Sequence, residues 1–271
     1  MIEKKQVLTV KIYFVEPVEI ITIVIDALIK LEFETYIVRE EDKEKLLKIL
    51  KNDIRNVIFL SIINEKEAER YLEYIDRLNN VKDSLVQVGA FIHGNIKEAS
   101  RMKILERNCS AIQFSDIQNE PLAVLKKILM YFEAKGIRKY VRVKAVGISE
   151  AYFSVKTLDN PIKTVVLDIS SHAFLCRVPD EFLLFFVPGD FFHDVLLVLK
   201  GMRIRTSVKV IGFNKESPDI FILQFYTAKV IDNKFKYEAK ILPETRNKLH
   251  AYIKLCLKEN LTLLLDSIPD D

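Results

Sequence analysis

The sequence predicts a two-domain protein with an α/β first half and an all-β second half. The chain has 271 residues, more than a typical single domain of about 100–200 residues. From residue 8 to about residue 134 the apolar pattern switches between strand and helix spacing, and after Ala134 it is strand-like for most of its length. We therefore expect the boundary between residues 135 and 136, which gives domains 1–135 and 136–271.

The first half alternates strand-like and helical segments. Five short runs rich in β-branched and aromatic residues predict strands, and the apolar spacing between them predicts helices. The expected strands are 8–15, 35–38, 56–63, 85–92 and 111–114, and the expected helices are 18–31, 41–52, 65–78, 96–107 and one that begins at Pro121. Because parallel strands need crossover helices, this order predicts a doubly wound, parallel (βα)5 domain.

The second half contains short strand-like runs separated by Gly, Pro, Asn and Asp. Such a pattern predicts a small antiparallel β-barrel, because closure removes exposed sheet edges. The expected strands are 141–148, 150–157, 163–170, 173–178, 194–202, 204–213 and 220–226. From Pro243 onward, Leu249, Ile253 and Leu257 form an apolar stripe at helical spacing, so we expect a C-terminal helix.

Composition and charge argue against several kinds of function. The 41 basic and 38 acidic residues leave a net charge of +3, too small for a general nucleic-acid surface, so we expect no DNA binding. The three cysteines and four histidines have no metal-ligand or disulfide spacing, and no catalytic set is visible. We therefore predict a protein that is not an enzyme and has no metal or cofactor. We expect neither a secretory signal nor a membrane span, which predicts a cytoplasmic protein.

The first half resembles the receiver domain of response regulators in the order of its elements. That family phosphorylates an aspartate at the end of the third strand, assisted by an acidic pair after the first strand and a lysine after the fifth. Here Ser61 stands at the aspartate position, only Glu16 follows the first strand, and Ser115 replaces the lysine. The departures predict a pseudo-receiver without phosphotransfer that serves docking or dimerisation. Another flavodoxin-like domain remains the alternative.

Two motifs stand near the start of the second half. The segment RKYVR, residues 138–142, has an RxxxR pattern, and DISSHA, residues 168–173, is close to a (D/N)xSxxG pattern. Arg142 precedes Asp168 by 26 positions, which is the length of one β-hairpin. Together with the barrel pattern, these motifs resemble the PilZ family over about residues 136–260. The resemblance implies binding of cyclic di-GMP by a set of residues that comprises Arg138, Lys139, Arg142, Asp168, Ser170 and Ala173.

The residue types in these motifs suit that ligand. The planar guanidinium of arginine bonds phosphate oxygens or guanine O6 and N7 through two N–H groups, and it stacks on a purine. Asp168 and Ser170 are two residues apart, so an extended segment places them on one face. The carboxylate could accept guanine N–H groups or orient an arginine, and the hydroxyl could donate to phosphate.

Each motif also has a structural interpretation. The arginines could belong to a solvated linker, and Asp168 and Ser170 could cap a turn through local N–H groups. Ala173 stands where the motif has glycine. A positive φ there would cost alanine about 1 kcal/mol, and a need for ligand clearance could cost more.

The resemblance implies an effector that binds cyclic di-GMP, changes its domain arrangement and so regulates an unidentified protein partner, for example in motility or surface behaviour. The alternative is a degenerate PilZ adaptor that acts through protein contacts without nucleotide. Dimerisation is common among receiver-like domains, so a homodimer is compatible with the first half, although the sequence assigns no interface.

Overall fold

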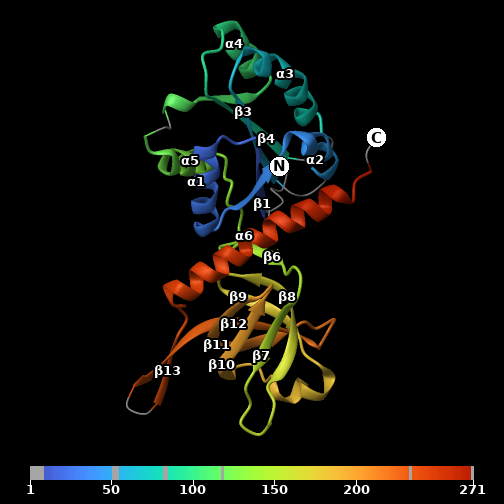
Figure 1. The fold of residues 1–271 in the computed structure, drawn as a ribbon, viewed down its shortest axis with the longest axis vertical. Coiled ribbons are helices and arrows are strands. Elements are labelled where there is room, and N and C mark those ends of the chain that lie inside the picture. The colour runs from blue at the N-terminus through green and yellow to red at the C-terminus, as the bar shows by residue number, and fades with distance from the viewer. Residues whose placement is uncertain (1–8, 51–54, 82–84, 117–118, 232–233, 270–271) are drawn as a thin grey trace, which may run out of the picture. The chain divides into compact units, whose positions relative to one another are not determined.

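The computed structural model describes residues 9–50, 55–81, 85–116, 119–231 and 234–269. The chain divides into two compact units, of which the first comprises residues 1–141 with 261–271 and the second comprises residues 142–260. Relative to the expected ranges, residues 136–141 and 261–271 group with the first unit. Figure 1 shows the fold of both units.

The first unit is built on a parallel five-stranded sheet in the order β2-β1-β3-β4-β5. This order is typical of doubly wound, flavodoxin-like folds, in which the direction of winding reverses between β1 and β3. The predicted doubly wound sheet is therefore confirmed. Its strands are β1 (Val10–Val15), β2 (Glu34–Val38), β3 (Arg55–Ile62), β4 (Leu85–Ile92) and β5 (Cys109–Gln113).

Helices cover both faces of this sheet, with α1 and α5 together on one side and α3 and α4 together on the other (Figure 1). The helices are α1 (Glu19–Lys30), α2 (Lys43–Ile49), α3 (Glu65–Asn79), α4 (Glu98–Glu106) and α5 (Pro121–Tyr131). The helix expected at 41–52 is shorter, because its beginning forms a 3-10 turn at Glu40–Asp42. Residues 51 and 52 of that expected helix, and residue 8 of the first expected strand, lie outside the described residues.

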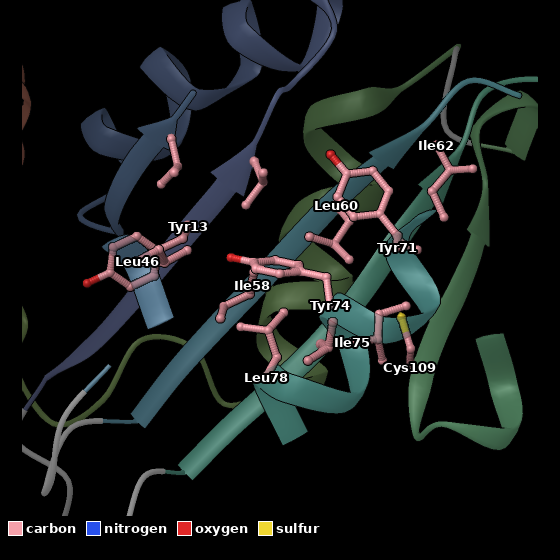
Figure 2. Close-up of a cluster of buried hydrophobic side chains, with 14 of the residues drawn as sticks. Tyr13, Leu46, Ile58, Leu60, Ile62, Tyr71, Tyr74, Ile75, Leu78 and Cys109 are labelled. Carbon is pink, nitrogen blue, oxygen red and sulfur yellow. The ribbon is translucent and has the colours of Figure 1, made fainter. Parts of the chain in front are cut away.

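A cluster of buried apolar side chains lies between the sheet and the helices α2 and α3. Tyr71 and Tyr74 of α3 pack there with the inward side chains of β1 and β3 (Figure 2). Leu261 and Leu265, from the last turns of α6 (Pro243–Asp266), belong to the same cluster. The end of α6 is therefore part of the hydrophobic core of the first unit.

The second unit is an antiparallel barrel, which confirms the predicted all-β fold. Six strands follow the order β11-β10-β7-β8-β9-β12, and pairing of β12 with β11 closes the ring. The short strand β6 pairs with β8, and β13 extends from β12. The strands are β6 (Arg142–Lys144), β7 (Ser149–Phe153), β8 (Ile162–Ser170), β9 (Ala173–Arg177), β10 (Phe191–Leu199), β11 (Met202–Phe213), β12 (Ile220–Ile231) and β13 (Lys234–Glu238).

Two expected strands of the barrel, 141–148 and 150–157, extend further than the observed β6 and β7, which end at Lys144 and Phe153. The run 141–148 forms a strand only at β6, whose pairing with β8 ends at Lys144. Gly147, with a φ of +61°, then turns the chain before β7 begins. A buried polar group then holds the part of α6 that belongs to this unit. The Tyr252 hydroxyl lies 2.6 Å from the Ser149 hydroxyl and accepts the Val146 N–H at 3.1 Å.

The C-terminal helix predicted from Pro243 is confirmed as α6, which continues to Asp266. Among the residues that the structure describes, no helix is both long and apolar enough to cross a lipid bilayer.

Candidate functional site

The pairing of β6 with β8 brings the two motifs together. Arg142 lies opposite Ser170, and Lys144 lies opposite Asp168. Between them, Val143 and Ile169 are paired and buried, so they face the barrel interior. Because side chains alternate along a strand, the four polar residues share the outer face of the barrel.

A β-bulge at Leu167 gives Asp168 this outward direction. Before the bulge, the even-numbered residues Ile162, Thr164 and Val166 are buried. The register against β9 shifts between Val166 and Asp168, and beyond the shift the odd-numbered Ile169 is buried instead. Without the extra residue, the carboxylate of Asp168 would point into the apolar interior, where burial of a charge is costly.

Arg142 and Asp168 form an ion pair, in which the Arg142 Nε donates a hydrogen bond to Asp168 Oδ1. The Arg142 side chain is 43% exposed and that of Asp168 is 21% exposed. An ion pair this accessible to water adds little stability, about 0–1 kcal/mol. It does restrict the orientation of the guanidinium, and it uses one of the five N–H donors of that group.

Ser170 has a different environment from the one its motif suggests. Its hydroxyl oxygen accepts the N–H groups of His172 at 3.2 Å and Ala173 at 3.0 Å, and the hydroxyl also donates to the Ala173 carbonyl at 3.0 Å. The side chain is buried in the turn between β8 and β9. These bonds agree with the turn-capping interpretation of Ser170.

Ala173 is the first residue of β9 and pairs with Gln224 of β12. It is not among the non-glycine residues of the described chain that have a positive φ, which are Glu16, Glu32, Asn108, Glu133 and Lys200. The backbone conformation at this position therefore does not require glycine. The cost considered for a positive φ does not arise at Ala173.

Arg138 and Lys139 lie in the segment between α5 and β6 and group with the first unit. Both side chains are exposed, and the Lys139 Nζ lies 5.3 Å from the centre of the Tyr140 ring. The remaining predicted site residues, Arg142, Asp168, Ser170 and Ala173, lie together in the second unit. Lys144 joins them on the outer face, and strand alternation from Arg142 was the sequence signal for it.

The carboxyl end of the first unit's sheet carries the positions compared with receiver domains. Ser61 is buried near the end of β3, and Glu16 directly follows β1, where its carboxylate accepts a hydrogen bond from the Tyr71 hydroxyl at 2.9 Å. Burial raises the pKa of Glu16, and the neighbouring Glu40 carboxyl raises this pKa further. Within the described ranges, no three His, Cys, Asp or Glu side chains are grouped as a metal ion would require. The pseudo-receiver remains a prediction.

No protein-family model and no curated protein sequence matches this chain. Several solved structures are similar to part of it. YcgR of Escherichia coli in complex with c-di-GMP shows 12% identity and a TM-score of 0.35, over 49% of this chain and 51% of that chain. The isolated PilZ domain of YcgR with c-di-GMP shows 12% identity and a TM-score of 0.33, over 49% of this chain and 99% of that domain.

Two further similar structures come from other bacteria. The inhibitor of motility MotI/DgrA of Bacillus subtilis shows 17% identity and a TM-score of 0.32, over 46% of this chain and 52% of that chain. The MrkH–c-di-GMP complex of K. pneumonia shows 12% identity and a TM-score of 0.32, over 48% of this chain and 53% of that chain. The similarity therefore spans about half the length of YcgR, MotI/DgrA and MrkH. The PilZ family, predicted from the motifs, is represented among these structures by the YcgR domain.

Proposed function

We propose that this chain binds cyclic di-GMP on the outer face of its barrel, at Arg142 and Asp168, and acts as a regulatory effector without enzymatic activity. One observation carries the proposal. The bulge at Leu167 turns Asp168 outward, and the pairing of β6 with β8 sets Arg142 beside it, although the two residues are 26 positions apart. Such bulges are frequent beside binding sites, where they re-aim a side chain.

The chemistry of the pair suits a cyclic dinucleotide. The guanidinium, oriented through its Nε by Asp168, offers its other N–H groups to a phosphate or to guanine O6 and N7. Lys144, on the same face, adds a second positive charge. Both cations would attract a ligand that carries two phosphate charges.

Arg138 and Lys139 would add further contacts in the proposed complex. Because Arg138 and Arg142 belong to different units, a ligand held by both would restrict the arrangement of the units. In this proposal, cyclic di-GMP acts by ordering residues 135–142, and the altered arrangement regulates a protein partner.

A second candidate function is a nucleotide-independent adaptor. The observation that favours it is Ser170, whose hydroxyl makes three hydrogen bonds inside its own turn and would have to exchange one of them to donate to a phosphate. Under this alternative, the Arg142–Asp168 pair would be a surface ion pair without a ligand.

Titration of the full chain with cyclic di-GMP by isothermal calorimetry separates the two functions. We expect saturable binding by the wild type and a loss of about 1.5–3 kcal/mol in Arg142→Ala, the range for hydrogen bonds to charged groups. Arg205→Ala is the matched control, because Arg205 forms an exposed pair with Asp194 at 2.9 Å elsewhere on the barrel. Absence of binding by the wild type at high micromolar ligand would reject the nucleotide proposal and favour the adaptor.

A further inference from the structure

Apolar side chains are exposed near one end of the barrel and on the adjoining outer wall. Five large apolar side chains are exposed there, and we call them the mouth patch: Leu184 (90% exposed), Val187 (50%), Phe213 (48%), Ile211 (45%) and Ile222 (38%). Single exposed apolar residues are common on soluble proteins, but a group of neighbouring ones is typical of an interaction surface.

Leu184 and Val187 are exposed on either side of Phe185 and Phe186, of which Phe186 is buried. The segment after β9 forms a 3-10 helix, Asp180–Phe185, and then inserts Phe186 into the barrel. The Phe186 ring packs 5.3 Å from that of Phe221 and 4.9 Å from that of Phe153. Leu184 and Val187 flank this anchor and remain outside.

The neighbouring strands supply the rest of the patch. Gly189 donates its N–H to the Val210 carbonyl at 2.8 Å, which ties the segment to β11. The register between β11 and β12 shifts directly after Val210, at Ile211, and this irregularity accompanies the exposure of that side chain. Phe213 pairs with Phe221, with ring centres 6.1 Å apart. Ile222 lies on the outer face, because the adjacent Phe221 is directed inward.

The patch has an acidic border. The two segments that form it, residues 177–190 and 211–222, contain five acidic and only two basic side chains, whereas the whole chain has a net charge of +3. One of the two basic residues, Arg177, pairs with Asp219 at 2.8 Å. Asp180, Glu181 and Asp190 are exposed beside the apolar residues. The local charge is therefore negative, opposite in sign to the charge of the chain.

We propose that the mouth patch docks a partner protein through a segment that carries apolar side chains beside lysine or arginine. The apolar centre would supply affinity, and the acidic border would select a basic partner. The same border disfavours the anionic surface of a membrane.

This surface does not depend on cyclic di-GMP binding. The strand β9 runs from Ala173, beside Arg142 and Asp168, to Arg177 at the mouth, a separation of about 13 Å at the usual rise per strand residue. Ile222 lies nearer to the candidate site, because it pairs with Leu175, which in turn lies opposite Asp168, about 10 Å away at the usual strand spacing. The test therefore uses Leu184 and Val187, whose segment follows β9 at the end away from Arg142 and Asp168.

The test uses two synthetic helical peptides with the same leucine face, one with lysine and the other with glutamate at every polar position. Binding of each labelled peptide to the full chain is followed by fluorescence anisotropy. We expect the lysine peptide to bind and the glutamate peptide to bind at least about tenfold more weakly. Leu184→Ser combined with Val187→Ser is expected to weaken binding of the lysine peptide by about tenfold or more, because these two are the most exposed side chains of the patch.

The matched control is Ile148→Ser, which removes an apolar side chain that is 71% exposed. Ile148 accepts a hydrogen bond from Lys200, at the opposite end of β10 from the mouth, so this variant should bind as the wild type does. Asp180→Lys combined with Glu181→Lys keeps the apolar centre and is expected to reverse the preference between the peptides.

Three results would overturn the proposal. The first is equal binding of both peptides by the wild type. The second is unchanged binding in Leu184→Ser with Val187→Ser. The third is evidence that something else binds to the patch. Either the wild type forms a dimer, or it sediments with phosphatidylcholine vesicles, and Leu184→Ser with Val187→Ser abolishes that dimer or that sedimentation.

Discussion

The two roles open to Asp168 can be separated by a double-mutant cycle with Arg142. Its carboxylate accepts a hydrogen bond from Arg142 Nε, so it could act by orienting the arginine. It also lies on the outer face and is 21% exposed, so it could contact a guanine directly. The cycle compares Arg142→Ala, Asp168→Ala and the double variant in their affinity for cyclic di-GMP.

The structure favours the orienting role, and the expected magnitudes follow from it. Loss of Arg142 removes charged hydrogen bonds to the ligand worth about 1.5–3 kcal/mol, which corresponds to a reduction in affinity of about 10- to 150-fold. Loss of Asp168 removes the accessible ion pair with Arg142, worth about 0–1 kcal/mol, and the affinity should fall by at most about fivefold. The double variant should then bind no more weakly than Arg142→Ala alone.

Calorimetric titration of the four proteins measures the coupling free energy directly. The orienting role would be refuted if Asp168→Ala alone weakened binding by about 1.5–3 kcal/mol and the effects of the two single variants on the binding free energy added up in the double variant. Asp168 would then contact the ligand directly. The same cycle on Arg205 and Asp194, which form a comparable exposed pair, is the control and should leave the affinity unchanged.

Three further predictions concern other parts of the chain. Ala173→Gly should leave the affinity for cyclic di-GMP unchanged within about twofold, because Ala173 has no positive φ to relieve; a rise of tenfold or more in the same titration would contradict this reasoning. Leu265→Ala should destabilise the first unit by about 2–5 kcal/mol, because this side chain is buried in its core, with 4% exposure. Urea unfolding followed by circular dichroism measures the change. The control is Leu263→Ala, which should change the stability little, because Leu263 is 64% exposed. Folding raises the pKa of Glu16, so ionisation of this carboxyl opposes folding. Glu16→Gln should therefore stabilise the chain at pH 7 and lose this advantage as the pH falls below the pKa of Glu16. If the variant gained more stability over the wild type at pH 4 than at pH 7, ionisation of Glu16 would favour folding and the prediction would be wrong.

Most of the secondary structure could be predicted because apolar periodicity is a local property of the sequence. The five parallel strands, their helices and the strands of the barrel follow from the spacing of apolar residues and from turn residues. The extent of β6 could not be predicted, since residues 141–148 look strand-like throughout, whereas the pairing with β8 ends at Lys144, opposite the residue that follows the bulge. Nor did the pattern predict the 3-10 segment Asp180–Phe185 that inserts Phe186 into the barrel.

The candidate site was predictable in its residue types but only partly in its geometry. Spacing placed Arg142, Asp168, Ser170 and Ala173 close together, and they do lie together in the second unit. The structure assigns Ser170 to the turn between β8 and β9, a role that the sequence allowed but did not distinguish from ligand binding. It also adds Lys144 to the outer face.

The sequence by itself determined the class of each half and the presence of an arginine and an aspartate in two motifs 26 residues apart, because these depend on residue types and local period. Only the tertiary structure decided that Asp168 faces outward beside Arg142, that Ala173 has no positive φ, and that Leu184 and Val187 stay exposed while Phe186 is buried. These features depend on hydrogen-bond register between strands distant in the chain. A single bulged residue such as Leu167 moves every later side chain of the strand to the opposite face of the sheet. The position of such a residue cannot be predicted from the local sequence pattern.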